Sequence, residues 1–269
     1  LEHGFDYTVT GAPIIIADGL RSKNVTEVNI GKKHFSTVML ATDIVSADSM
    51  IVLSHFKAHE MAGFGGAIKN IAMGGAIALG KKQQHALKIT VDPDKCIGCS
   101  KCVAVCPAKA ISIVEGKARV SHDLCIGCGE CLTVCPVKAN GIDWETDIVN
   151  FIERMTEYGY GVHKSHEGHI GYMNFLVNIT PDCDCVPWSD TPIVPDIGIL
   201  ASLDPVAIDQ ASFDLVNSQP GFANSLLSSN LEAGADKFKG LRPHTDGSIQ
   251  MKYGEEIGMG SRNYELITL

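Results

Sequence analysis

Features that would tie the protein to membranes or nucleic acids are absent from the sequence. No apolar run approaches the ~20 residues that a membrane helix needs, and the start shows no signal-peptide pattern. Basic residues are in the minority, since 22 Lys and Arg face 31 Asp and Glu for a formal net charge of −9. A nucleic-acid partner would favour a basic face, so we expect neither a nucleic-acid nor a membrane partner.

The sequence also lacks low-complexity segments, and its first residue is Leu1 rather than methionine. An apolar segment at residues 14–17 already reads as a buried strand, so we expect an N-terminally truncated chain. The 269 residues are enough for one large or two ordinary domains. With 45% hydrophobic residues, they allow a sizeable core.

Cysteine, by contrast, is abundant and unevenly placed, because eight of the ten cysteines lie in two short runs. Residues 96–107 and 125–136 both follow C-x2-C-x2-C-x3-C-P, the bacterial ferredoxin spacing for a [4Fe–4S] cluster. Zinc sites usually pair two C-x2-C units across a longer gap. Such cysteine usage also argues against a disulfide scaffold and for a reducing compartment. We therefore predict two [4Fe–4S] clusters and a cytoplasmic location.

The fourth cysteine of each run precedes a proline and, in two-cluster ferredoxins, ligates the cluster of the other run. By that rule each cluster draws its ligands from both runs. The two sets are Cys96, Cys99, Cys102 and Cys135 for one cluster, and Cys125, Cys128, Cys131 and Cys106 for the other. Gly98 and Gly127 would let the backbone approach the sulfides, since glycine has no Cβ and tolerates positive φ.

The cysteine runs belong to a unit too small to account for the whole chain. We expect an α+β ferredoxin-like domain at residues 87–142, inserted into an α/β domain made of residues 1–86 and 143–269. Short apolar runs outside the insert suit parallel strands that are buried on both faces. They are residues 14–17, 50–53, 174–179 and 197–200. The fold class we predict is therefore α/β, with an open, mostly parallel sheet.

Helical patterns lie between these apolar runs. An amphipathic stripe with the spacing i, i+3, i+4, i+7 is formed by Ile148, Phe151, Ile152 and Met155. A later helix is expected to begin with Asp204 as its N-cap and Pro205 at the first helical position. Between the two, His163, His166 and His169 are spaced like a metal tract, but glycines flank them. We expect a surface loop with solvated imidazoles there.

In open α/β sheets, ligands gather beyond the carboxyl ends of the strands. After the run 50–53 come His55, Lys57 and His59, which share one face if the strand continues, because side chains alternate. Two imidazoles and an ammonium could act on an anionic ligand or bind a metal. A solvated strand end is the competing interpretation.

A glycine-rich turn that enters a helix follows, with Gly63, Gly65, Gly66 and Lys69. Free backbone N–H groups of such a turn could cradle an anion beside Lys69. The turn matches neither the Walker A pattern nor G-x-G-x-x-G. Close packing of backbone on backbone is the alternative explanation of the glycines.

The two cysteines outside the runs, Cys183 and Cys185, are flanked by Asp182 and Asp184 and follow the apolar run 174–179. They could donate thiolates to a metal, form a strained redox pair or pack as small hydrophobes. Parallel strands end at the same edge of a sheet. We therefore expect Cys183 and Cys185 to share a site with His55 and His59.

Several segments together resemble the uncharacterised prokaryotic iron–sulfur centre proteins (domain of unknown function 362). They are residues 54–70, 179–185 and 203–209 together with the double cysteine run. The resemblance covers nearly the whole chain, and it implies further residues before Leu1. A second likeness, to the nickel-pincer lactate racemases, rests on the loop from His59 to Lys69. It places Lys69 where those enzymes contact their cofactor, although they lack a ferredoxin insert.

The leading hypothesis is an iron–sulfur electron-transfer protein or a component of an oxidoreductase. Electrons from a low-potential donor or redox partner protein would pass through the clusters to a site on the α/β domain. That site would include His55, Lys57, His59, Lys69, Cys183 and Cys185, with an additional metal or a small anionic ligand. Two alternatives stay open: a racemase- or lyase-like enzyme with structural clusters, and a protein that delivers metal or clusters.

Overall fold

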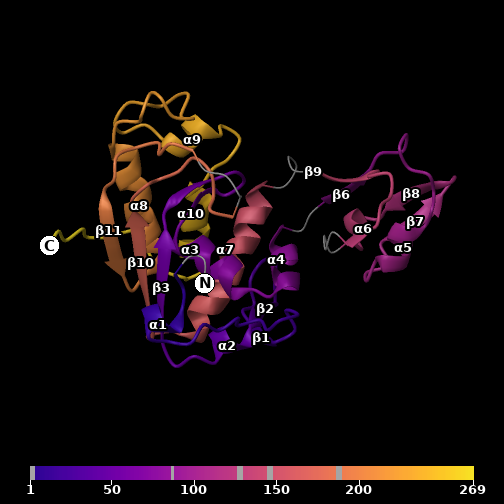
Figure 1. Ribbon diagram of the computed structural model, residues 1–269, viewed down its shortest axis with the longest axis horizontal. Coiled ribbons are helices and arrows are strands. Elements are labelled where there is room, and N and C mark those ends of the chain that lie inside the picture. The colour runs from indigo at the N-terminus through magenta and orange to yellow at the C-terminus, as the bar shows by residue number, and fades with distance from the viewer. Residues whose placement is uncertain (1–3, 86–87, 126–129, 144–147, 186–189) are drawn as a thin grey trace.

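The computed structural model describes residues 4–85, 88–125, 130–143, 148–185 and 190–269. Its elements form two bodies, a larger one of helices and strands and a smaller one that contains the cysteine runs (Figure 1). The chain enters the smaller body after α4 (Ala78–His85) and leaves it before α7 (Ile148–Ser165). The described residues therefore mix helices and strands, in keeping with the α/β class.

The main sheet of the larger body has the strand order β11-β10-β3. β10 (Ile170–Leu176) lies between β3 (Met50–His55), to which it is parallel, and β11 (Gly198–Ser202), to which it is antiparallel. The register sets Phe175 opposite His55, so the carboxyl ends of β3 and β10 lie together. The expected parallel sheet is thus corrected: in the described residues it is a small mixed sheet.

The strand expected at residues 14–17 is not formed, and that prediction was wrong. Its three isoleucines are 59%, 64% and 61% exposed. The strands nearest in sequence are β1 (Val25–Asn29) and β2 (Thr37–Ala41), which pair with each other in an antiparallel hairpin. β-branched residues favour strands only where a neighbouring strand and a packing surface exist, and no described strand pairs with this segment.

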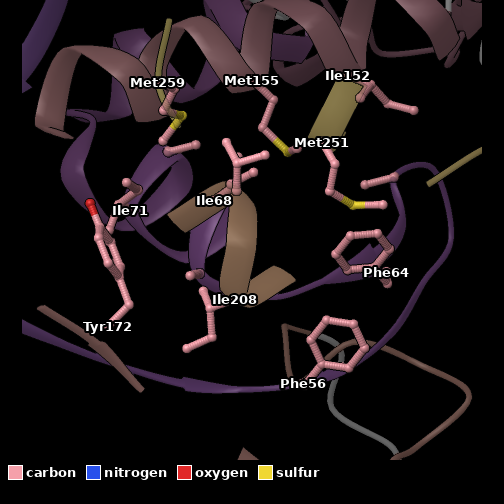
Figure 2. Packing of buried hydrophobic residues seen from close by; sticks show 14 of the residues in the cluster. Phe56, Phe64, Ile68, Ile71, Ile152, Met155, Tyr172, Ile208, Met251 and Met259 are labelled. Atoms are coloured by element: carbon pink, nitrogen blue, oxygen red, sulfur yellow. The ribbon is translucent and has the colours of Figure 1, made fainter. Parts of the chain in front are cut away.

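Four helices pack on one another: α3 (Ala67–Gly75), α7, α8 (Pro205–Ser218) and α10 (Ser248–Glu256). Two of them, α3 and α8, also pack on the main sheet. Ile68 of α3 lies close to Met155 of α7 in the middle of the core (Figure 2). Both side chains are fully buried, and burying a side chain of this size contributes about 1.5–3 kcal/mol relative to exposure.

Two helix predictions are confirmed. The last three residues of the amphipathic stripe are buried along α7. α8 begins with Pro205 after the N-cap Asp204, whose carboxylate accepts hydrogen bonds from the N–H groups of Val206 at 2.8 Å and Ala207 at 2.9 Å. Both signals are local in sequence, so they do not depend on the rest of the fold.

The loop expected around the three later histidines is corrected in part. α7 continues to Ser165, so His163 lies on its last turn, where Nδ1 is 2.8 Å from the hydroxyl of Tyr172. His166 is buried, with Nδ1 3.1 Å from the carbonyl of Val162. Residues 166–169 do form a turn before β10, so the expected loop is right for the last two histidines, but of the three only His169 is exposed. The contact of His163 with β10 is not visible in the local sequence.

The described part of the smaller body has two strand pairs and two short helices. They are β6 (Lys88–Val91) with β9 (Asn140–Asp143), β7 (Ile111–Val114) with β8 (Lys117–Val120), α5 (Lys101–Val105) and α6 (Glu130–Thr133). The antiparallel pairing of β6 with β9 brings the start and the end of this body together. Ile89 and Ala118 are buried among its cysteines.

The remaining elements are short. They are α1 (Tyr7–Thr10), α2 (Thr42–Val45), β4 (Lys57–His59), β5 (Gly63–Gly65) and α9 (Lys237–Leu241). β4 and β5 form a hairpin between β3 and α3. None of the described helices is both long enough and apolar enough to cross a membrane.

Candidate functional sites

Cysteines from both runs line one hollow in the smaller body. Cys96, Cys99 and Cys102 come from the first run, at the start of α5 and in the loop before it. Cys135 comes from the second run, just after α6. A cubane cluster is held by four thiolates. These four cysteines are the set that the ferredoxin spacing assigns to one cluster, so the residues present fit that group.

Backbone N–H groups point at the cysteine sulfurs in the same way in both runs. Cys106 Sγ accepts a hydrogen bond from the N–H of Ala110 at 3.2 Å, and Cys135 Sγ accepts one from Ala139 at 3.2 Å. A third N–H, from β8, lies 3.3 Å from Cys96 Sγ. The repeat thus places equivalent donors at the fourth cysteine of each run. Hydrogen bonds to cluster sulfurs help to set the reduction potential of a cluster.

The second predicted ligand set is described in part. Cys106, Cys125 and Cys131 belong to the smaller body, whereas Cys128 lies outside the described residues. Burial raises the pKa of Cys102 in the first set. Burial also acts to raise the pKa of Cys135, but backbone donors outweigh it and lower that pKa. A lower pKa favours the thiolate, which is the form that binds metal.

Gly98 has a positive φ, as the sequence allowed, and it also has a second structural reason to be glycine. Its φ is +66°, and a Cβ on it would lie 2.3 Å from the carbonyl oxygen of Gly116, in the turn between β7 and β8. Close approach to this turn therefore requires a glycine here, in addition to the approach to sulfide that stays a prediction. Gly127 lies outside them.

The larger body holds a cavity of about 360 Å³ at the carboxyl edge of β3. The residues lining it come from β3, the β4–β5 hairpin, α3 and the C-x-C segment. They are Leu53, His55, Lys57, Gly65, Gly66, Lys69, Asn70, Met73, Gly74, Cys183, Asp184 and Cys185. The structure thus brings most of the residues predicted for the site to one cavity. Gly63 and His59 are not among them.

His55 is held by acceptors on both sides of its ring. Nδ1 lies 2.9 Å from Oδ2 of Asp184, and Nε2 lies 3.0 Å from the carbonyl of Val177 and 3.1 Å from that of Asn178. Lys57 Nζ donates to the same Oδ2 at 3.1 Å. Burial acts to raise the pKa of Asp184, but His55 and Lys57 outweigh it and lower that pKa. With both nitrogens engaged, His55 orients Asp184 rather than offering a lone pair to a metal.

Cys183 lies at the wall of the cavity beside a buried ammonium. Its side chain is 3% exposed, and Sγ lies 3.6 Å from Lys69 Nζ. The N–H of Cys185 donates to the same sulfur at 3.5 Å. Burial and the neighbouring Cys183 raise the pKa of Cys185 to about 11. The two sulfurs therefore have different surroundings: Cys183 is buried beside the ammonium of Lys69, whereas Cys185 is exposed.

His59 lies behind the cavity, 7% exposed. Its Nδ1 accepts hydrogen bonds from the N–H groups of Met61 at 3.1 Å and Ala62 at 3.0 Å, so the neutral ring carries its proton on Nε2. Burial, helped by the charge of Lys69, holds the pKa of His59 well below its usual range. One ring nitrogen of His59 and the two sulfurs of the C-x-C pair lie within 4.8 Å of one another.

The glycine-rich turn is used differently from the expected anion loop. The first N–H groups of α3, on Ala67 and Ile68, donate to the carboxylate of Asp209 at 2.7 and 2.9 Å. Gly63 packs on the backbone of Gly247, where a Cβ would lie 2.6 Å from nitrogen. Part of the turn is thus closed by protein atoms, whereas Gly65, Gly66 and Lys69 still face the cavity.

Asp209 is the residue that sequence reasoning missed. It is fully buried on α8, and Asn174 on β10 also donates to it at 2.8 Å. Burial raises its pKa to about 6, against the effect of these hydrogen bonds. An acidic residue between apolar positions of an expected helix was the available signal, because a buried carboxylate requires donors. Of the two aspartates that flank the C-x-C pair, Asp184 lines the cavity, whereas Asp182 pairs with Arg242.

Comparison with known proteins identifies the family. The family described as Domain of unknown function (DUF362) matches residues 1–214. The chain belongs to this family. A second match is to Ferredoxin-2 of Desulfomicrobium norvegicum (strain DSM 1741 / NCIMB 8310), with 53% identity over 30 residues. That match covers 11% of this chain and 51% of the ferredoxin, so the chain spans about half the length of that relative. The likeness and the cysteine-rich body point to iron–sulfur binding.

Proposed function

We propose that the protein is an iron–sulfur electron carrier, a component of a redox system that holds two [4Fe–4S] clusters in residues 87–142. One observation carries the proposal: Cys135 of the second run lines the same hollow as three cysteines of the first run. Two independent zinc or structural sites would not need this exchange of ligands. A bound [4Fe–4S] cluster supplies one-electron redox chemistry.

The chain's own residues would tune and expose these centres. The N–H groups of Ala110 and Ala139 would stabilise negative charge on the sulfurs of the two fourth cysteines. Two apolar side chains next to the first cysteine of each run, Ile97 and Leu124, are 63% and 57% exposed. A redox partner protein that docks beside the clusters would bury these two side chains, and each would add apolar contact area.

The cavity of the larger body would be where such electrons are used. Lys57 and Lys69 line it and would hold a small anionic substrate there. In Figure 1 the cluster-bearing body stands apart from β3 and α3, which line this cavity, so the route would include a bridging partner or a movement between bodies. The alternatives of a racemase-like enzyme or of a delivery protein predict no electron flow. A bound nickel or organic cofactor would favour the first of them, and transfer of clusters to an apo-acceptor would favour the second.

The test is cluster content in anaerobically purified full-length protein. We expect about eight iron and eight sulfide per chain, with electron paramagnetic resonance signals after reduction by dithionite. Cys135→Ser should damage the cluster of the first run and Cys106→Ser that of the second. The matched substitution Cys185→Ser, outside the cysteine runs, should leave iron and sulfide unchanged. Damage confined to each variant's own run, or centres that dithionite cannot reduce, would overturn the proposal.

A further inference from the structure

Three soft donor atoms converge in the larger body, away from the cysteine runs. They are Sγ of Cys183, Sγ of Cys185 and a ring nitrogen of His59, all within 4.8 Å of one another. We propose that these residues bind one divalent transition metal of the zinc class, as a third metal centre. This inference goes beyond the electron-carrier function and does not rest on it, since the donors lie outside residues 87–142.

The donor types and spacing suit zinc. Thiolate and imidazole together favour zinc and related late transition metals, with Zn–S at about 2.3 Å and Zn–N at about 2.0–2.1 Å. Donor atoms within 4.8 Å of one another would have to approach by on the order of 1 Å to meet these bond lengths. Cys185 is exposed and belongs to the same loop as Cys183, so one short loop can make this adjustment.

The surroundings of His59 determine how it would bind. Nδ1 accepts two backbone N–H bonds, from Met61 and Ala62, and Nε2, which carries the proton of the neutral ring, lies 3.6 Å from Oε2 of Glu60. A metal at Nε2 would displace this proton to the carboxylate of Glu60, and the ring would bind as an imidazolate whose Nδ1 keeps its two N–H donors. Two thiolates and this deprotonated ring carry three negative charges, which the divalent ion and the ammonium of Lys69, 3.6 Å from Cys183, balance. Buried charge requires such compensation.

The open side of the centre would face the cavity. Both cysteines line the cavity, and together with His59 the described residues supply three ligands. Zinc sites with three protein ligands keep a fourth position for water or substrate, whereas structural zinc sites are closed by four. Lys57 and Lys69 line the same cavity. The centre would therefore bind a small anion at its fourth position, held by these ammonium groups.

Zinc itself is the probe, on anaerobically purified full-length protein with its iron in place. We expect about one zinc per chain by mass spectrometry of metals. Zinc-edge X-ray absorption should show two sulfurs at about 2.3 Å and one nitrogen at about 2.0–2.1 Å. Cys183→Ser should abolish this binding while iron and sulfide stay unchanged. Iron content thus reports on the proposed function and zinc content on this inference.

Two histidine variants show whether a loss of zinc comes from a missing ligand or from misfolding. In His59→Asn the side-chain oxygen can still accept from Met61 and Ala62, but Nε2 is gone, so zinc affinity should fall at least tenfold. His169→Asn, at an exposed histidine, should leave the affinity unchanged. If Cys183→Ser fails to fold, Cys185→Ser at the exposed cysteine decides the matter. Absence of zinc from the wild type, equal zinc binding by Cys185→Ser, or zinc bound only as iron is lost would overturn the proposal.

Discussion

The two bodies of this protein build their cysteine sites in opposite ways. In the smaller body, eight cysteines at ferredoxin spacing sit within residues 96–135 of the sequence, and four of them, Cys96, Cys99, Cys102 and Cys135, line one hollow. In the larger body, the site draws on segments that are more than a hundred residues apart in sequence, such as His59 and Cys183. A local motif can be recognised in the sequence, whereas a site of the second kind exists only once the sheet has formed.

Substitution of two glycines, one in each body, would test whether the bodies are independent. Gly98 and Gly63 both have positive φ and both approach backbone atoms closely, with Cβ positions 2.3 Å from Gly116 O and 2.6 Å from Gly247 N. Replacing either with alanine should cost about 3 kcal/mol, from the strained φ and the overlap together. Gly98→Ala should lower the iron content, and Gly63→Ala should lower the melting temperature followed by circular dichroism at 222 nm.

Glycines in open space provide the controls for this comparison. Gly116 and Gly168 also have positive φ, but nothing lies within 4 Å of their Cβ positions. Gly116→Ala and Gly168→Ala should therefore cost only about 1 kcal/mol. If Gly63→Ala lost iron as readily as Gly98→Ala, the two bodies would fold as one unit and the contrast between them would fail.

The substitution Asp209→Ala is expected to lower the free energy of unfolding by less than the two glycine substitutions do. Its carboxylate accepts from the N–H groups of Ala67 and Ile68 and from Asn174. Removing it leaves buried donors unpaired and should reduce the free energy of unfolding by about 2 kcal/mol. Urea unfolding measures the change. Asp214→Ala, at an exposed position of α8, should stay within about 0.5 kcal/mol of the wild type.

The contribution of Asp209 to the free energy of unfolding should decrease as the pH rises. Burial raises the pKa of Asp209 to about 6 in the folded protein, above the ordinary 3.8. The stability that this shift contributes is complete below about pH 4 and is lost as pH rises through about 6. The difference between wild type and Asp209→Ala should therefore shrink from pH 4 to pH 7. A difference that grows over this range would contradict the assignment.

The smallest expected effect concerns anion binding in the cavity. Lys69 is buried beside Cys183 and lines the cavity. Lys69→Gln should weaken the binding of inorganic phosphate about tenfold, since a charge-assisted hydrogen bond is worth about 1.5–3 kcal/mol. Titration calorimetry measures the affinity, and iron content should not change. Lys23→Gln, at an exposed lysine, is the matched control, and equal affinities in both variants would rule out the role of Lys69.

Local signals in the sequence predicted several elements correctly. The α7 stripe and the Asp204–Pro205 start of α8 were confirmed because side-chain periodicity and capping act within a few residues. The strand at residues 14–17 was wrong, since strand formation depends on a partner that the local composition does not reveal. His163 was placed in a loop because its contact with β10 was not visible in the sequence.

The sequence by itself singled out the candidate residues: the two cysteine runs, the C-x-C pair, His55, His59 and Lys69. Tertiary structure alone decided which partners the described ones contact. The parallel register of β3 with β10 places the segment after Leu176 against the segment after His55, so His59 meets the sulfurs while His55 is held by carbonyls and Asp184. The fold of α8 likewise brings Asp209 to the start of α3. Spacing along the chain sets local geometry, but strand register and helix packing come from many weak contacts distributed over the whole core.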